Sequence, residues 1–327
     1  MLKLFNFLIL FSLFSFISCL ITLQPYNIQN KIATVSGISS GGYMAVQVHI
    51  AFSSFINGSG IFAGGPYHCA EGSLSTATYS CMKATIPIDI SKLVQYTKDQ
   101  TKKGTIDSYN NLYYHKVYLF SGEVDSVVSP KVMSSLNDYY LSFIPSSNIV
   151  PVFNINAEHT YPTLSDGNPC TTLKSPYVGK CSYDGAGYTL TTLYSDIKTR
   201  GTEVSSNLFE FDQTPYFTGR ISVSKSGYIY IPTSCSQNTA CHLHVAFHGC
   251  EQGYEFVKLD FITKSGYNSW AENNNVIVVY PQAMSDQVLG NPNGCWDWWG
   301  YTGITDYTLK KGAQMQFIEK IIKALIK

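Results

Sequence analysis

A pentapeptide near the beginning of the chain limits the folds that this sequence can adopt. Residues 37–41 read Gly-Ile-Ser-Ser-Gly, which fits G-x-S-x-G, and they lie between a β-branched run at 32–35 and a helical pattern over 40–55. A strand, a sharp turn and a helix in this order can hold a serine hydroxyl at a sheet edge, because the glycines leave room for the strained turn. We therefore predict that Ser39 is a nucleophile. A Gly/Ser loop without a catalytic role is the alternative.

A serine hydroxyl attacks only when a base accepts its proton, so a histidine and an acid must lie elsewhere in the chain. Asp125 follows a predicted strand at 117–120, and His159 follows a predicted strand at 149–155. Parallel strands bring their carboxyl ends to one edge of a sheet, where these loops can meet. We expect His159 to act as general base and Asp125 to orient it. Two nearby carboxylates compete for the acid role: Glu123 and Glu158.

Short apolar runs that alternate with helical patterns indicate an α/β fold. The order serine, acid, histidine is that of α/β-hydrolases, with a mostly parallel sheet, helices on both faces, and strands before the serine. Too few residues precede Ser39 for those strands. A buried strand at 243–247, a His-Gly-Cys loop, a strand at 276–280 and an amphipathic helix at 308–326 occur instead near the C-terminus. We therefore predict a circularly permuted α/β-hydrolase, which is feasible because domain termini often lie close together.

The His-Gly-Cys loop also supplies a predicted oxyanion hole. The backbone N–H groups of Ser40 and Cys250 would face the oxygen of a tetrahedral intermediate. We place His248, in the same loop, in the substrate-binding wall. The segment at 294–300 is rich in tryptophan, and its rings either line an ester pocket or pack in the core. The substrate-binding interpretation assigns three of them to the pocket: Trp296, Trp298 and Trp299.

Three further segments complete the expected fold. Residues 160–215 are rich in loops and form an insertion over the site. A β-hairpin is expected at 221–231, and a helix at 259–271. One catalytic domain over 20–327 accounts for all these elements.

The first 19 residues predict a secretory signal peptide. Lys3 precedes an uncharged apolar run at 4–17, and small residues follow. A transmembrane anchor is the alternative, but this run is shorter than the ~20 residues that a span needs. An exported chain can carry a glycan, and the sequon at Asn57 is its predicted site.

Eight cysteines follow the signal peptide, and an even number in an exported chain indicates disulfides. Proximity in sequence favours Cys69–Cys81, Cys170–Cys181 and Cys235–Cys241, which leaves Cys250–Cys295. Other pairings stay open, because eight cysteines allow 105 connectivities. The spacing does not fit a zinc site, so no metal is expected.

The composition excludes two classes of partner. The chain has 22 Lys+Arg and 22 Asp+Glu, and only 13% of its residues are charged. A neutral chain offers no basic surface to nucleic acid or to an anionic membrane. The 24 Tyr and 18 Phe suit an uncharged partner better.

Together these segments resemble the extracellular poly(3-hydroxybutyrate) depolymerases of the esterase/PHB-depolymerase family. Six motifs carry the resemblance, at residues 37–44, 122–125, 158–162, 248–252, 279–283 and 294–298. The permuted order is similar to that of the fungal-type, single-domain members.

The resemblance implies a secreted serine carboxylic-ester hydrolase that forms an acyl-enzyme through Ser39, Asp125 and His159, without a metal or cofactor. It implies a polyester or hydroxyalkanoate oligomer as substrate. We expect a monomer without a membrane anchor, outside the cell or in a digestive vacuole. Two alternatives remain: a feruloyl or acetylxylan-type carboxylesterase, and a non-catalytic, disulfide-stapled surface or binding protein.

Overall fold

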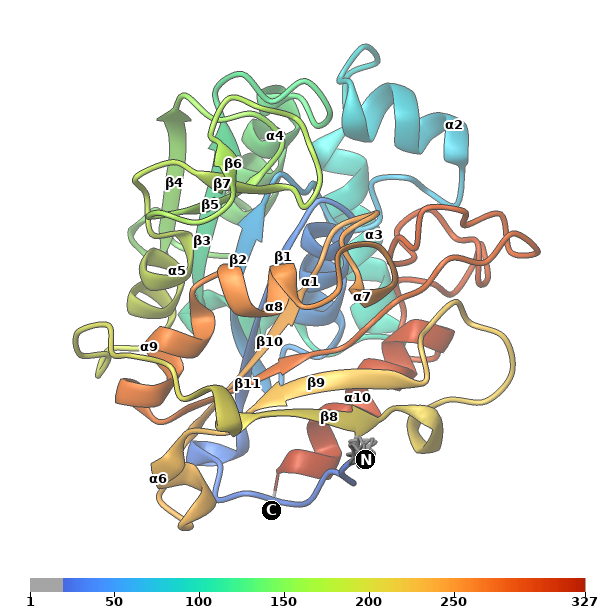
Figure 1. Cartoon of the computed structure of the whole chain (residues 1–327). Coiled ribbons are helices and arrows are strands. Elements are labelled where there is room, and N and C mark those ends of the chain that lie inside the picture. Colours follow the sequence, from blue (N-terminus) through green and yellow to red (C-terminus); the bar gives the residue numbers. More distant parts are fainter. Residues whose placement is uncertain (1–19, 327) are drawn as a thin grey trace, which may run out of the picture.

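The structure is a computed structural model, and it describes residues 20–326. The predicted signal peptide at 1–19 lies outside these residues. An eight-stranded sheet crosses the middle of the molecule, with helices on both faces (Figure 1). Its strands lie in the order β4-β3-β2-β1-β10-β11-β9-β8. Neighbouring strands from β4 to β11 are parallel, whereas β9 is antiparallel to both β11 and β8.

The strands of the large sheet are β1 (Ala33–Ile38), β2 (Ile56–Phe62), β3 (Lys116–Gly122), β4 (Ile149–Ile155), β8 (Leu208–Asp212), β9 (Ser226–Tyr230), β10 (His242–Phe247) and β11 (Val276–Tyr280). A small three-stranded sheet consists of β5 (Tyr161–Thr163), β6 (Asn168–Pro169) and β7 (Val178–Lys180). The α-helices are α1 (Ser40–Ala51), α2 (Leu74–Thr76), α3 (Ile90–Lys102), α4 (Pro130–Leu141), α5 (Gly185–Leu193), α6 (Thr233–Ser236), α7 (Tyr254–Val257), α8 (Asp260–Lys264), α9 (Tyr267–Asn274) and α10 (Ala313–Leu325).

The strand order confirms the circular permutation. Strand β1, the first in the chain, lies in the middle of the sheet and pairs with β2 on one side and with β10 on the other. If the chain is read from β8 to its end and then from β1 to β4, the strands cross the sheet from edge to edge, with only β10 and β11 exchanged. The two ends meet, since the Tyr26 N–H donates to the Leu325 carbonyl at 2.8 Å.

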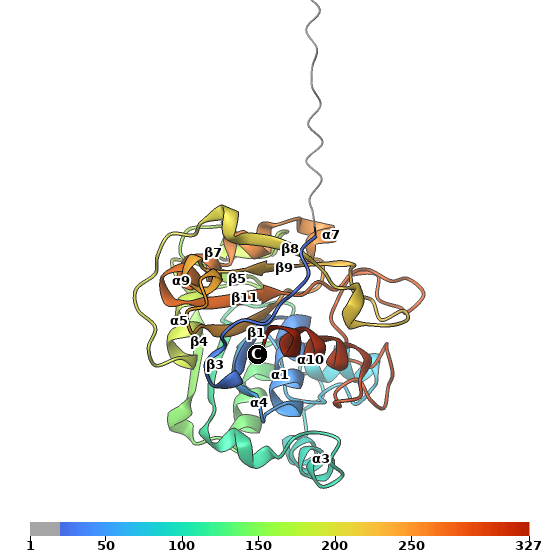
Figure 2. The ribbon, with the colours of Figure 1, turned by 90° about the horizontal axis from the view of Figure 1, so that it is seen from below.

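Two layers of helices cover the sheet and enclose two cores. Helices α1, α4 and α10 belong to one layer, and α5 and α9 to the other; Figure 2 shows α1 and α10 side by side. Every residue of α1 is buried, because this helix lies between the sheet and its neighbours. Such a helix is mostly apolar or small on all sides, as its Gly, Ala and Val content allows, and its buried Gln47 donates to the Asp297 carbonyl.

Several predicted elements agree with the structure, and three differ from it in extent or pairing. Strands β4 and β11 have the predicted bounds. The predicted helix at 259–271 is broken into α8 and α9, because Gly266 adopts a φ of 92°. The predicted hairpin at 221–231 is wrong: β9 pairs with β8, whose residues lie in the segment expected to be loop-rich. Helix α10 begins five residues later than expected, with Gly312 as its N-cap.

Four disulfides fasten the loops: Cys69–Cys81, Cys170–Cys181, Cys235–Cys241 and Cys250–Cys295. Three of these are the pairs that proximity in the sequence favoured, and Cys250–Cys295 is the pair that remained. No helix between residues 20 and 326 combines the length and the hydropathy that crossing a membrane requires.

Candidate active site

Ser39 stands on a strained turn between β1 and α1. Its φ and ψ are 57° and −125°, values that a residue with a Cβ rarely adopts. The turn requires close packing on both sides. A Cβ on Gly37 would lie 2.2 Å from the Gly41 carbonyl oxygen, and a Cβ on Gly41 would lie 2.3 Å from the His248 carbonyl oxygen. The glycines of the pentapeptide are therefore needed for this geometry, and they bring the start of α1 against the loop after β10.

Asp125 and His159 meet at the carboxyl ends of β3 and β4. The His159 Nδ1 and Asp125 Oδ2 atoms are 2.8 Å apart, and both residues are 7% exposed. The other carboxylate oxygen of Asp125 accepts the backbone N–H groups of Val127 and Val128, at 2.9 and 2.8 Å. With the carboxylate held on both oxygens, Nδ1 is its hydrogen-bond donor and Nε2 remains available for proton transfer.

The competing acids have other positions. Glu158 accepts the backbone N–H groups of Ser126 and His159 through one carboxylate oxygen. It therefore connects the loop after β3, which holds Asp125, to the loop after β4, which holds His159. Glu123 is exposed. Asp125 is therefore the carboxylate that contacts the imidazole ring of His159.

A single cavity of about 490 Å³ brings the two halves of the site together. Its lining includes Ser39 and His159, with Asp125 directly behind the imidazole ring. Many of the remaining lining residues have large apolar or aromatic side chains: Ile38, Tyr43, Leu74, Met82, Val127, Val128, Leu173, Trp298 and Trp299. The cavity therefore suits a neutral, largely apolar substrate rather than a charged one.

The two predicted oxyanion donors, Ser40 and Cys250, also line this cavity. Ser40 is the first residue of α1, where a backbone N–H has no partner within the helix. Next to Cys250, the Gly249 N–H donates to the Gln252 side chain at 2.8 Å, and the Glu251 N–H donates to the Asn293 carbonyl at 2.7 Å. The Cys250 N–H between them has no partner within residues 20–326. Both donors are thus available to a ligand.

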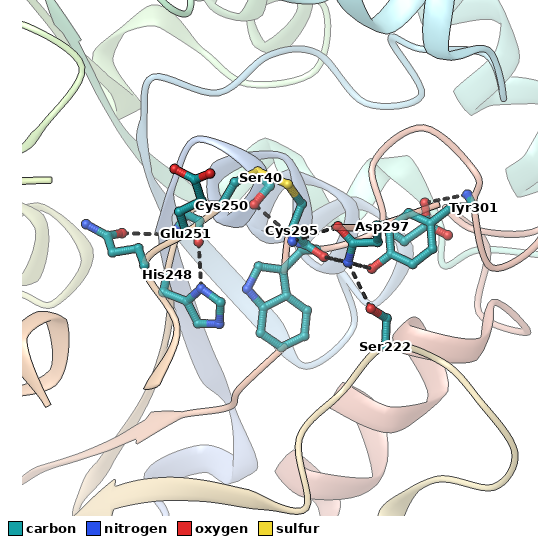
Figure 3. The surroundings of a disulfide bond; sticks show 12 residues. Ser40, Ser222, His248, Cys250, Glu251, Cys295, Asp297 and Tyr301 are labelled. Carbon is teal, nitrogen blue, oxygen red and sulfur yellow. Dashed lines mark hydrogen bonds between the residues drawn. A yellow bond between two sulfur atoms is a disulfide. The ribbon is translucent and has the colours of Figure 1, made fainter. Parts of the chain in front are cut away.

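The disulfide Cys250–Cys295 joins the loop of residues 248–252, hereafter the 248–252 loop, to the tryptophan-rich segment (Figure 3). Ser40 lies beside this disulfide, and its side-chain oxygen accepts the backbone N–H of Trp296 at 3.3 Å. Asp297 accepts three backbone N–H groups of the following turn, at 2.7 to 3.0 Å. These bonds hold Trp298 against Tyr43, with the ring centroids 4.3 Å apart and the rings nearly parallel.

Two residues assigned to the substrate-binding wall are instead buried behind it. His248 and Trp296 are both 0% exposed, and neither lines the cavity. The His248 ring donates from Nδ1 to the Gly249 carbonyl at 2.7 Å and accepts the Ala283 N–H on Nε2 at 3.1 Å. Burial lowers the pKa of His248 to about 4. These two residues therefore pack on the core side of the 248–252 loop, away from the cavity. Trp298 and Trp299, in contrast, do line the cavity.

The sequon at Asn57 lies in the sheet rather than on a loop. Asn57 lies in β2, an inner strand of the sheet, and its side-chain oxygen is buried. A glycan acceptor normally lies on an exposed loop. Asn57 as a whole is only partly buried, so the glycan at this sequon stays a prediction.

The lining residues that the sequence analysis missed include Tyr177, Glu251 and Gln252. Gln252 is 1% exposed and connects the 248–252 loop to the backbone carbonyls of Pro176 and Tyr177, at 3.1 and 2.9 Å. The motif at 248–252 contained two of them, but no spacing rule assigned them a role. Within residues 20–326, no group of three His, Cys, Asp or Glu side chains is arranged to hold a metal ion.

A permuted α/β-hydrolase sheet with a serine on the turn after its central strand is the arrangement of a serine hydrolase. No family model matches the chain. The sequence is 41% identical over 307 residues to poly(3-hydroxybutyrate) depolymerase of Delftia acidovorans, which covers 92% of this chain and 61% of that relative. It is 38% identical over 319 residues to polyhydroxybutyrate depolymerase of Talaromyces funiculosus, covering 93% of this chain and 92% of that one. The chain belongs to the polyhydroxybutyrate depolymerase family.

Solved structures agree with this assignment. The crystal structure of PHB depolymerase from Penicillium funiculosum has a TM-score of 0.87 and 37% sequence identity, over 94% of this chain and 99% of that one. A structure of PHB depolymerase (S39A) complexed with an R3HB trimer gives the same values. The chain spans about three fifths of the length of the Delftia relative, which is 61% covered.

Proposed function

We propose that this protein is a secreted esterase that hydrolyses poly(3-hydroxybutyrate)-type polyesters through Ser39, His159 and Asp125. The observation that supports the proposal most is the shared cavity: Ser39 and His159 line it, and the imidazole is bonded to a buried carboxylate. The proposed catalytic domain is the whole of residues 20–327. The four disulfides fit a protein made for an oxidising compartment.

In the proposed mechanism, His159 Nε2 accepts the proton of the Ser39 hydroxyl as its oxygen attacks the ester carbonyl. Asp125 stabilises the imidazolium that forms, and the backbone N–H groups of Ser40 and Cys250 stabilise the oxyanion. One such donor contributes about 3–4 kcal/mol to the stability of the transition state. The imidazolium then protonates the leaving alkoxide, which departs as an alcohol and leaves an acyl-enzyme.

Water completes the cycle. His159 accepts a proton from a water molecule as its oxygen attacks the acyl carbonyl, and it then returns the proton to Ser39. The product is a hydroxy acid or a shorter oligomer. Apart from the ester and the water molecule, the proposed steps involve side chains and backbone groups of this chain.

The substrate part of the proposal is supported by the cavity wall and by the relatives. Both curated relatives are named for the depolymerisation of polyhydroxybutyrate, and one solved neighbour is complexed with an R3HB trimer. A polyester is uncharged, and the wall is mostly apolar. Exposed Leu74 and Leu173 at the cavity surface would contact such a chain directly.

Hydrolysis by the secreted protein tests the proposal. The release of 3-hydroxybutyrate from polymer granules should exceed hydrolysis of feruloyl and acetylxylan esters, and Ser39→Ala should reduce it by about 10⁴-fold or more. An organophosphonate should label Ser39, as peptide mass spectrometry would detect. Preference for feruloyl or acetyl esters would move the function to another carboxylesterase. Absence of any labelling would favour a non-catalytic binding protein.

A further inference from the structure

The cavity wall contains one negative charge that the proposed mechanism does not use. Among the described lining residues, only Glu251 has a side chain that is charged at neutral pH, apart from the titratable His159. Glu251 directly follows Cys250, the proposed oxyanion donor. A carboxylate is unexpected there, because the adjacent site must stabilise negative charge that develops on the substrate.

Several contacts fix the position of Glu251. Its backbone adopts a positive φ of 54°, and its N–H donates to the Asn293 carbonyl at 2.7 Å. The Tyr177 hydroxyl donates to the Glu251 carboxylate at 2.9 Å, which holds the side chain against the loop that follows His159. Figure 3 shows the Glu251 carboxylate on the opposite side of the loop from the buried His248 ring. The carboxylate is therefore presented to the cavity rather than to the core.

The charge of Glu251 is not neutralised by a cation. Within residues 20–326, no lysine, arginine or histidine forms an ion pair with it. Glu251 is two residues from Gly249, where an added Cβ would lie 3.2 Å from the Ser39 Cβ. Since one peptide unit spans about 3.8 Å, the Glu251 Cα lies no more than about 8 Å from the Gly249 Cα, and Glu251 and Ser39 line the same cavity.

Hydrolysis changes the charge of the ligand at this place. Each turnover consumes one ester bond and one water, and yields one hydroxyl group and one carboxylic acid that loses its proton to solvent at neutral pH. The bound polymer segment is neutral, whereas the product carries a carboxylate. In an apolar cavity of low dielectric, two such charges repel more strongly than in water.

We propose that Glu251 determines specificity by this charge: it disfavours ligands with a free carboxylate in the cavity and so promotes release of the acid product. The inference rests on the proposed polyester hydrolysis. Neutral ester segments bind beside Glu251 without repulsion, and carboxylate ends are directed away from the 248–252 loop.

Two ligands that differ only in charge test this inference. In the Ser39→Ala background, which prevents turnover, calorimetry gives the Kd of the R-3-hydroxybutyrate trimer acid and of its methyl ester. We expect Glu251→Gln to lower the ratio of the acid Kd to the ester Kd by about fivefold to tenfold at low salt. The change should shrink in 0.5 M salt, because salt screens the repulsion.

Two further variants separate charge from structure. Glu123→Gln removes one exposed carboxylate outside the cavity wall and should leave the ratio unaltered. Glu251→Asp keeps the charge and should keep the ratio within twofold of the parent. If Glu251→Gln leaves the ratio unaltered, or if Glu251→Asp shifts it as much, the inference is wrong.

Different results would overturn the proposed function and the inference about Glu251. If the protein with Ser39 intact releases no hydroxybutyrate from polymer, or if neither trimer binds, polyester hydrolysis is wrong and the inference fails with it. If the polymer is hydrolysed but the ratio does not respond to Glu251→Gln, only the role of Glu251 is overturned.

Discussion

The two sides of the candidate active site are held in place by different means. Ser39, Asp125 and His159 stand at the ends of β1, β3 and β4, where sheet pairing and short backbone turns set their positions. The 248–252 loop follows β10 and is fastened mainly by side chains, namely the Gln252 amide, the His248 ring and the disulfide Cys250–Cys295. Changes at the strand ends should therefore impair the chemistry alone, whereas changes in the loop fastening should also alter its shape.

Asp125→Asn probes the strand-end side and has the largest expected effect. Asparagine can still accept the N–H groups of Val127 and Val128, so the turn should keep its form. Its amide no longer stabilises the imidazolium or the required tautomer of His159. We expect kcat for release of hydroxybutyrate to fall about 10⁴-fold, with little change in Tm.

Glu123→Gln is the matched control for Asp125→Asn, because it neutralises an exposed acid in the same loop. It should retain the full rate. A similar loss in both variants, or an Asp125→Asn rate above one tenth of the original, would show that the carboxylate of Asp125 does not assist His159.

Removal of the Cys250–Cys295 disulfide probes the loop side. The bond closes a 45-residue loop, so replacing both cysteines by serine should lower the free energy of unfolding by about 4 kcal/mol on chain entropy. Because Cys250 also carries a proposed oxyanion donor, kcat should fall as well. Denaturant unfolding and initial rates measure the two effects.

The Cys235–Cys241 disulfide provides the comparison for this variant. It closes a loop of only 6 residues outside the cavity, so its removal should cost about 2 kcal/mol and leave kcat unaltered. If the two removals reduced kcat equally, the loop would not depend on its disulfide for catalytic geometry.

The same contrast explains what the sequence could predict. Short apolar runs indicate strands such as β4 and β11. The order of motifs along the chain was enough to predict the permuted sheet. The pentapeptide placed Ser39 on a strand–turn–helix, since G-x-S-x-G encodes the backbone strain itself. The catalytic roles of Asp125 and His159 stay predictions.

Burial was harder to predict than position. His248 and Trp296 lie in the correct loops, but motif spacing does not say which face of a loop a side chain takes. The partner of β9 was missed because β8 comes from a segment rich in polar residues and because β9 was expected to pair within 221–231. Gln252 and Glu251 form hydrogen bonds with residues 176 and 177, about 75 positions away in the chain. No local sequence pattern predicts contacts between positions so far apart.

His248 offers a pH test of the loop side. Its pKa is lowered to about 4 by burial, while the unfolded chain has the ordinary value of about 6.5. The unfolded state therefore binds more protons between pH 6.5 and 4, and its folded counterpart loses stability as the pH falls through this window. Protonation of His248 on Nε2 would also remove the hydrogen bond that this nitrogen accepts from the Ala283 N–H.

We expect His248→Gln to flatten this pH dependence by roughly 1–3 kcal/mol, measured by denaturant unfolding at pH 7, 5.5 and 4. Buried His244, whose pKa is lowered to about 3 by burial, lies within β10, outside the lining of the cavity, and is the comparison. His244→Gln should flatten the stability profile without altering kcat at pH 7. An unaltered profile in His248→Gln would mean that this ring does not stay neutral in the fold.

Gln252→Ala has the smallest expected effect and gives the most specific test of the loop side. Its amide occupies the Gly249 N–H and connects the loop to the carbonyls of Pro176 and Tyr177. Without this amide the Cys250 N–H should be less well aligned, which is less costly than losing a donor outright. We expect kcat to fall about tenfold with KM nearly constant, and the affinity for a boronate analogue of the tetrahedral intermediate to fall in proportion.

Gln213→Ala is the matched control, because Gln213 is also a fully buried amide, bonded to the Ser224 and Gln282 carbonyls outside the cavity wall. It should lower Tm without a comparable loss of kcat or of boronate affinity. If both substitutions reduce kcat and boronate affinity equally, Gln252 contributes to stability only. A selective loss in Gln252→Ala means instead that the buried Gln252 amide aligns the oxyanion donor. Because this amide is bonded to the chain that follows His159, Gln252 would then couple the two sides of the site.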